Sequence, residues 1–207
     1  MKKLSLYIFL FYLQYSMSQE FYFDTILEYK ELKSLASYTY SINSKDGTYY
    51  LYTNHGIKSD FPTIIDSNQN VKHEFEALNR DDSTHFKYLQ SKELIVDPYG
   101  SNFVVEQFEK KVDSTRSDIK IVVFKNKRKK KIECEIDILI DNSDSIFCNQ
   151  LLYTFCHGRL NNTNFSIRKG NLLRFKIVFE NSFKIEMNLI NKEKTNLILT
   201  AKNNTKK

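Results

Sequence analysis

Tryptophan is absent from this chain, and glycine and proline are scarce, with 5 and 2 residues among 207. Few glycines make a glycine-rich loop, whose backbone N–H groups cradle a phosphate, difficult to build. The sequence also has no G-x-S-x-G nucleophile motif, no H-E-x-x-H metal motif and no Cys-x-x-Cys pair. We therefore expect a non-enzymatic protein with no cofactor, no metal site and no catalytic residue.

The few histidines and cysteines leave two questions open. The chain has three cysteines, and this odd number leaves at least one thiol unpaired, even in a compartment that permits disulfides. Cys134 lies on the apolar side of a strand pattern and is expected to be a small buried hydrophobe. Two or more histidines meeting a carboxylate in the fold would instead indicate an enzyme of hydrolase type. The histidines are His55, His73, His85 and His157.

Residues 1–18 have the pattern of a cleavable signal peptide. Lys2 and Lys3 precede an apolar run from Leu4 to Tyr12. The small residues Ser16 and Ser18 then occupy the two positions that a signal peptidase reads. The run is shorter than the roughly 20 apolar residues that cross a bilayer. We therefore expect export to the periplasm or the extracellular space, without a transmembrane segment after cleavage.

The rest of the composition favours one globular domain. Aromatic residues make up 14% of the chain, with 13 Tyr and 16 Phe, and such residues favour strands. We expect a single β-rich domain over 19–201 and a disordered tail over 202–207. Basic and acidic residues are evenly mixed, so that, together with export, the charge argues against a nucleic-acid partner.

Apolar and polar residues alternate in much of the second half, which is typical of strands with one buried face. The pattern predicts mainly β structure, with a curved antiparallel sheet or open barrel of roughly 8–11 strands. In the hairpin of 119–140, a loop centred on Lys127-Arg128 would place Lys120 opposite Glu135 and Val122 opposite Glu133. The predicted strands cover 23–29, 38–42, 48–53, 61–65, 85–89, 103–110, 119–123, 132–140, 165–168, 173–179, 183–189 and 196–201, with turns at 44–47, 169–171, 180–182 and 191–194.

One segment, 145–157, predicts a helix instead. Phe147, Leu151 and Phe155 recur every four residues, while Ser145 can cap the start and Gly158 can end it. In a helix, two cysteines eight residues apart are separated by about 12 Å, beyond the reach of a disulfide. The helix and a bridge between Cys148 and Cys156 therefore exclude each other, and any pairing among the three cysteines stays open.

A block of basic residues stands at the tip of the 119–140 hairpin. It can contact an anionic partner such as lipopolysaccharide or a membrane head group. The more common role of such a charge run is a solvated hairpin tip that resists edge aggregation. The possible contact residues are Lys125, Lys127, Arg128, Lys129, Lys130 and Lys131.

Two resemblances bear on function. The Lys-led signal ending in Ser-Gln, the segment Phe23 to Tyr29 and the segment Asn43 to Tyr50 resemble small exported proteins of uncharacterised function from Gram-negative bacteria. In architecture, a curved sheet wrapping a helix is similar to the open β-barrel of periplasmic lipoprotein carriers, which implies an apolar concave face that holds acyl chains.

These observations lead to one functional hypothesis and two alternatives. The first is an exported, non-enzymatic binding protein for a hydrophobic or lipid-like ligand or an envelope component. The second is a structural or surface interaction module without a ligand cavity, in which the strand aromatics serve only the core. A hydrolase-type enzyme comes third.

Overall fold

The computed structural model describes residues 18–34, 36–54, 61–80, 83–94, 103–143, 146, 151 and 170–202. They form one antiparallel sheet of 11 strands in the order β6-β5-β4-β3-β2-β1-β11-β10-β9-β8-β7. The strands are β1 (Ser18–Glu31), β2 (Ser37–Ile42), β3 (Tyr49–Asn54), β4 (Thr63–Asp66), β5 (Val71–Arg80), β6 (Ser83–Glu93), β7 (Val104–Lys111), β8 (Arg116–Phe124), β9 (Ile132–Asp141), β10 (Asn171–Phe179) and β11 (Lys184–Lys202).

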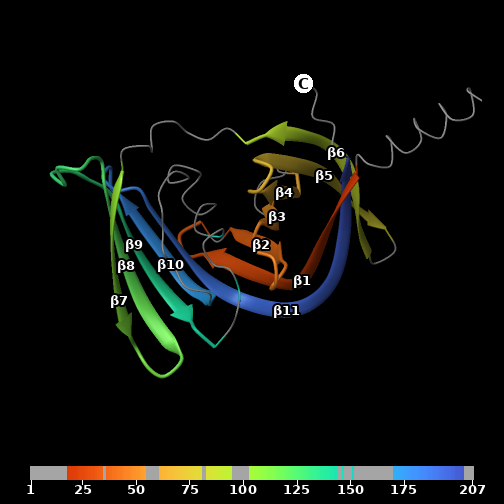
Figure 1. Ribbon diagram of the computed structural model, residues 1–207. Coiled ribbons are helices and arrows are strands. Elements are labelled where there is room, and N and C mark those ends of the chain that lie inside the picture. Colours follow the sequence, from red (N-terminus) through yellow and green to blue (C-terminus); the bar gives the residue numbers. More distant parts are fainter. Residues whose placement is uncertain are drawn as a thin grey trace, which may run out of the picture.

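The sheet is open and strongly curved. Its first strand, β1, pairs with its last, β11, so these two strands lie in the middle of the sheet, and the two edges are the consecutive strands β6 and β7. Figure 1 shows a U in which β7 to β10 form one arm, while β11 runs along the base and up the other side near β5 and β6. The predicted fold class, a mainly β protein with a curved antiparallel sheet, is therefore confirmed.

The long strand β11 corrects one prediction. The expected turn at 191–194 and the separate strand at 196–201 are wrong, because β11 continues through both as one strand of 19 residues. Two register shifts against β1, between Phe23 and Thr25 and between Glu28 and Tyr29, absorb the extra residues of β11. Such irregularities bend a strand without ending it, which lets a polar stretch follow the curve of the sheet.

The β8–β9 hairpin is confirmed, but its predicted register is wrong by two residues. Lys120 pairs with Asp137 and Val122 with Glu135, because the loop closes between Lys125 and Lys131 and a shift follows Val123. A two-residue slip keeps every side chain on its predicted face. On β9 the predicted apolar residues Cys134, Ile136, Ile138 and Ile140 are therefore buried, whereas Ile132, predicted to share their face, is 39% exposed because it lies beyond the register shift. The Lys120 ammonium still reaches the Glu135 carboxylate at 2.8 Å.

Strand β5 was not predicted from the sequence. Its buried positions include His73 and Glu74, which are 0% and 7% exposed, so no alternation of apolar and polar residues marks it. Glu74 keeps its charge there because the ammonium groups of Lys72 and Lys92 lie 3.0 and 2.8 Å from its carboxylate. The strands predicted at 61–65, 85–89 and 103–110 correspond to β4, β6 and β7.

Several predictions fall on residues outside the described part of the chain: residues 1–17 of the predicted signal peptide, 165–169, Cys148, Cys156 and nearly all of the predicted helix at 145–157. At the boundaries, Ser18 already belongs to β1 and Lys202 still belongs to β11. The Lys202 carbonyl accepts a hydrogen bond from the Tyr88 hydroxyl at 2.8 Å, so Lys202 is part of the sheet and not of a disordered tail.

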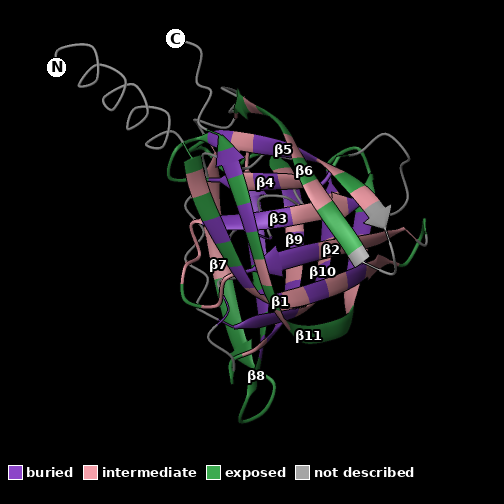
Figure 2. Ribbon diagram, turned by 90° about the vertical axis from the view of Figure 1, so that its right-hand side faces the viewer, coloured by how far each residue is buried: buried purple, intermediate pink, exposed green. Residues whose placement is uncertain are grey.

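Two apolar clusters hold the sheet together, and buried residues run along most strands in Figure 2. The larger cluster lies on one face and joins β1, β2 and β3 to β8–β11, with Leu27, Ile136 and Phe175 at its centre. The smaller cluster joins the beginning of β1 and the end of β11 to β3, β4 and β5. Its members are Phe21, Phe23, Tyr49, Leu51, Ile64, Phe75, Leu199 and Ala201.

Candidate functional site

The concave face of the sheet carries a row of tyrosines on three neighbouring strands. Because alternate residues of a strand share a face, the registers of β1, β2 and β3 bring these side chains together. The rings of Tyr29 and Tyr40 are 5.8 Å apart, those of Tyr40 and Tyr52 5.4 Å, and those of Tyr38 and Tyr52 6.2 Å. Tyr50 completes the row, 6.2 Å from Tyr40.

The members of this tyrosine row differ in their surroundings. Tyr29 is fully buried and its hydroxyl donates a hydrogen bond to the Leu172 carbonyl on β10 at 2.8 Å. Burial also raises the pKa of the Tyr40 phenol well above its ordinary value. Tyr38 and Tyr52 are only partly buried. The row therefore presents neutral aromatic surface that is covered at its centre and open at its edge.

The same face continues onto the β7–β10 arm. Val105 on β7 and Leu189 on β11 are half-buried against the larger cluster, as is Phe103 just before β7. Ile146 and Leu151, from the segment between β9 and β10, lie in this cluster and are 2% and 0% exposed. The concave face is thus apolar from arm to arm, with part of it covered by the chain itself.

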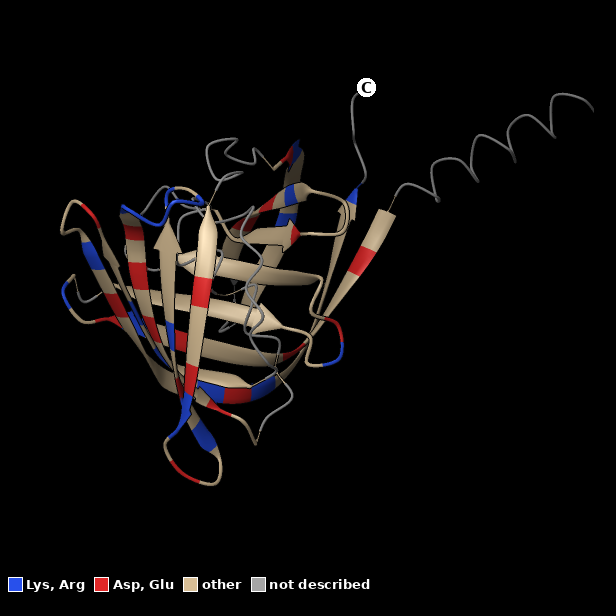
Figure 3. Cartoon of the chain, turned by 60° about the vertical axis from the view of Figure 1, so that its left-hand side comes forward, with Lys and Arg blue, Asp and Glu red and all other residues tan. Residues whose placement is uncertain are grey.

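The outer face of the β7–β10 arm is charged instead, as Figure 3 shows. One row crosses it through Phe108, Lys120, Asp137, Lys176 and Glu186, and the Lys176 ammonium lies 3.5 Å from the Asp137 carboxylate. A shallow groove of about 440 Å³ follows this row. Because the charges alternate in sign, the outer face has the character of a solvated surface.

The six basic residues predicted as an anionic contact all lie on the loop between β8 and β9, which we call the basic tip (Lys125–Lys131). Two of them have partners: Lys125 lies 3.6 Å from the Glu133 carboxylate and also pairs with Glu180, and Lys129 pairs with Glu106. The hydrogen bond with Glu180 is the main cause that raises the pKa of Lys125.

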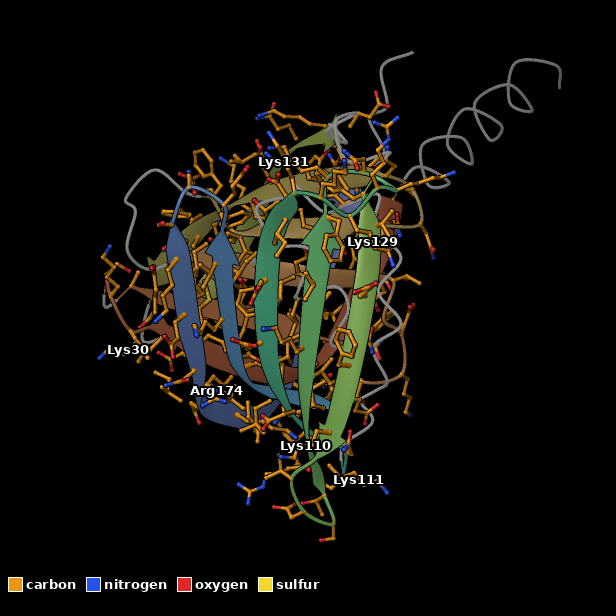
Figure 4. All side chains as sticks on the ribbon, turned by 90° about the vertical axis from the view of Figure 1, so that its left-hand side faces the viewer. Lys30, Lys110, Lys111, Lys129, Lys131 and Arg174 are labelled. Carbon is orange, nitrogen blue, oxygen red and sulfur yellow. The ribbon has the colours of Figure 1, made fainter. Side chains whose placement is uncertain are left out.

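The other four basic side chains of the tip are solvent-exposed. Within the described ranges none has an ion-pair partner, and all are exposed: Lys127, Arg128, Lys130 and Lys131. The loop itself is held by the Asn126 side chain and by a left-handed residue, Lys129 with φ 52°. Figure 4 shows Lys129 and Lys131 at one end of the arm and Lys110 and Lys111 at the other.

The histidines do not converge in the described structure. His85 pairs with Leu78, five residues along β5 from His73, while His55 and His157 lie outside the described residues. No group of three or more His, Cys, Asp or Glu residues in the described ranges is arranged to hold a metal ion.

His73 nevertheless begins a polar chain, leading from this buried ring to the surface, that the sequence did not indicate. Its Nδ1 lies 2.7 Å from the Ser91 hydroxyl, which lies 2.8 Å from the Tyr88 hydroxyl, and Tyr88 donates to the Lys202 carbonyl. Its Nε2 is buried without a hydrogen-bond partner among the described residues. Burial lowers the pKa of His73, against a weaker opposing effect of Asp66. This chain ties β6 to the end of β11.

A nucleophile–base pair would need more than the Ser91–His73 contact. A third group normally orients the base, and Asp66 is the acid whose charge acts on His73. Its carboxylate instead accepts hydrogen bonds from the Gln19 amide at 3.0 Å and from the backbone N–H groups of Asn68 and Gln69. The geometry therefore favours a structural role for His73.

Cys134 is a free, fully buried thiol, as the strand pattern predicted. Burial raises its pKa to about 12, so it is protonated at neutral pH and unsuited to nucleophilic attack.

No model of a known protein family and no curated protein matches this chain. The described part of the chain contains no helix that is long and apolar enough to cross a membrane.

Proposed function

We propose that this protein is an exported, non-enzymatic binding protein that takes a hydrophobic or lipid-like ligand on the concave face of its open sheet. The observation that supports the proposal is the apolar surface that runs from Tyr38 and Tyr52, past Leu189 beside Tyr29, to Val105 on β7 and retains partial exposure at both ends. Ligand sites are typically concave and lined by aromatic and aliphatic side chains with a few polar groups, as the phenol hydroxyls are here.

Binding of cis-parinaric acid, a fluorescent fatty acid, tests the proposal on the full-length chain. We expect saturable binding with one site per chain. The substitutions Val105→Glu and Leu189→Glu place a charge on the half-buried apolar face and should weaken binding at least about tenfold, since a charge in an apolar contact must be desolvated.

Phe108→Glu is the matched control, because Phe108 lies on the same strand as Val105, faces outward and is 58% exposed. It should leave binding unchanged. An absence of saturable binding by the folded wild-type chain would overturn the proposal and favour an interaction module without a ligand. Equal losses in Val105→Glu and Phe108→Glu would also overturn it. Circular dichroism separates lost binding from lost folding.

A further inference from the structure

Two turns meet at one end of the β7–β10 arm. They are the basic tip and the β10–β11 turn, and Figure 1 shows both at the upper rim of the U. The Glu180 backbone N–H donates to the Glu133 carbonyl at 2.9 Å, and the Lys125 ammonium bridges the two carboxylates. The two turns therefore form one surface, which we call the rim: the basic tip together with Ile132 and Phe183.

The rim exposes large apolar side chains that a solvated hairpin end does not need. Phe183 is 52% exposed and Ile132 is 39% exposed. Phe183 continues the concave face, because its ring lies 6.0 Å from the ring of buried Phe179. Ile132 begins β9 opposite Phe124, beyond the register shift that follows Val123. The apolar surface of the concave face thus extends outward to the rim.

The same rim carries an excess of positive charge. The basic tip supplies six basic side chains against the three carboxylates of Glu106, Glu133 and Glu180, an excess of three. All three acids are engaged with Lys125 or Lys129, and the other four basic side chains are exposed and have no ion-pair partner among the described residues.

Exposed aromatic and aliphatic groups beside unpaired cations fit one partner chemistry in particular. A lipid bilayer offers anionic head groups for the cations and, directly beneath them, an apolar layer for the side chains. A soluble polyanion would engage the cations but leave Phe183 and Ile132 in water. The combination therefore favours an anionic membrane surface.

We propose that the rim docks on the surface of an anionic lipid bilayer, with the basic tip against the head groups and Phe183 and Ile132 entering the interface. This inference rests on the proposed function and deepens it, because a bilayer is a source from which a lipid-like ligand reaches the concave face.

Flotation with vesicles of equal parts phosphatidylcholine and phosphatidylglycerol, compared with phosphatidylcholine alone, tests the charge requirement. We expect binding only to the anionic vesicles, weakened by added salt. The double substitution Lys130→Gln and Lys131→Gln should weaken it roughly thirtyfold, since each basic residue near an anionic surface contributes about fivefold.

The matched control is Lys110→Gln with Lys111→Gln, a second pair of adjacent exposed lysines at the opposite end of the arm. This double variant removes the same net charge. If the position of the charge matters, its binding to anionic vesicles should change by less than about threefold. Equal losses in the two pairs would overturn the rim as the docking site.

A single tryptophan reports the apolar contact, because the natural chain has none. In Phe183→Trp the emission should shift to shorter wavelength on anionic vesicles, whereas Phe108→Trp, at a similarly exposed position on the outer face, should not shift. Vesicle binding without a shift in Phe183→Trp would contradict insertion. Equally tight binding to heparin would overturn the bilayer as partner.

Failure of this inference is distinguishable from failure of the proposed function. The rim variants should bind cis-parinaric acid in solution as the wild-type chain does. If acyl binding persists and vesicle binding is absent, only docking is wrong. If vesicles bind and the acyl probe does not, the ligand proposal is wrong and the rim is a membrane contact alone.

Discussion

The two arms of the sheet bury their strands in different ways. On the β7–β10 arm the concave face is buried and the outer face is mostly exposed: Ile136 and Ile138 are 0% and 2% exposed, while the neighbouring carboxylates of Glu135 and Asp137 lie outward in ion pairs. On β3 both faces are covered, since Tyr49, Tyr50 and Leu51 are consecutive and all buried.

The long strands β1 and β11 cause this difference. The beginning of β1 and the end of β11 fold over the face of β3 to β5 that lies opposite the tyrosine row. There the Phe21 ring lies 5.0 Å from Tyr49 and 5.2 Å from His73. Strands β3 to β5 are thus covered on both faces by the sheet itself, whereas the outer face of the β7–β10 arm is exposed to water. An apolar ligand can therefore compete only for the shared concave face.

The largest effects should come from the two clusters. Phe175→Ala in the larger cluster and Phe21→Ala in the smaller one should each lower the free energy of unfolding by about 3–5 kcal/mol, because both side chains are fully buried. Phe108→Ala should change it by less than about 0.5 kcal/mol. Urea denaturation measures all three. A Phe21→Ala variant as stable as Phe108→Ala would show that the smaller cluster is not a core.

A smaller loss is expected from the contact that joins β1 to β10. Tyr29→Phe removes only the hydroxyl that donates to the Leu172 carbonyl, so the free energy of unfolding should fall by about 1–3 kcal/mol. In the exposed counterpart, Tyr22→Phe, the hydroxyl that bonds to Glu20 is solvated, so the free energy of unfolding should hardly change. Equal stability of the two variants would contradict a buried bond across the sheet.

The polar chain of His73, Ser91 and Tyr88, on β5 and β6, should make the free energy of unfolding depend on pH. Burial holds the pKa of His73 in the folded state below its ordinary value of 6.5, so below pH 6.5 the unfolded chain binds the proton first. The contribution of His73 is complete above pH 6.5 and declines as the pH falls from there toward the lowered folded-state pKa.

Thermal unfolding from pH 7.5 to 5 compares the wild-type chain with His73→Phe. The variant should lose the part of the pH dependence that begins near 6.5, because it has no titrating group at this buried position. His85→Phe, on an exposed site of β6, should retain it. A wild-type curve that is flat between pH 6.5 and 5 would be inconsistent with a buried neutral His73.

The smallest effect should come from the outer face of the β7–β10 arm. A double-mutant cycle between Lys176→Ala and Asp137→Ala should give a coupling energy below about 1 kcal/mol, since exposed pairs are screened by water and salt. The measurement is equilibrium unfolding at low and at high salt. A coupling above 2 kcal/mol that persists in salt would mean that this face is not solvated.

The contrast between the arms also explains what the sequence could predict. Alternation identified β8, β9 and β10 because one face of each is wet, and it placed Cys134 correctly in the core. It missed β5, where His73 and Glu74 are buried polar residues whose partners lie on other strands. Alternation also led to a wrong turn at 191–194. A run of polar residues occurs both where a strand ends and where a solvent-exposed strand bends, and the pattern does not distinguish the two.

The site was predictable only in part. The six basic residues were identified as a block, yet the partners of Lys125 and Lys129, namely Glu180 and Glu106, are distant in the sequence. Alternation predicted a strand over 183–189, but Phe183 lies just before β11 and is 52% exposed at the rim. Pairing and exposure depend on register and strand ends, which alternation alone does not determine.

The most direct test of ligand binding on the concave face is a two-dimensional amide NMR titration of the full-length chain with a medium-length fatty acid. Shifts should concentrate at Val105, Leu189 and the tyrosine row and spare the amides around Phe21 and Phe75 in the smaller cluster. Shifts confined to the smaller cluster or to the charged outer row, or no saturable shifts at all, would contradict the account.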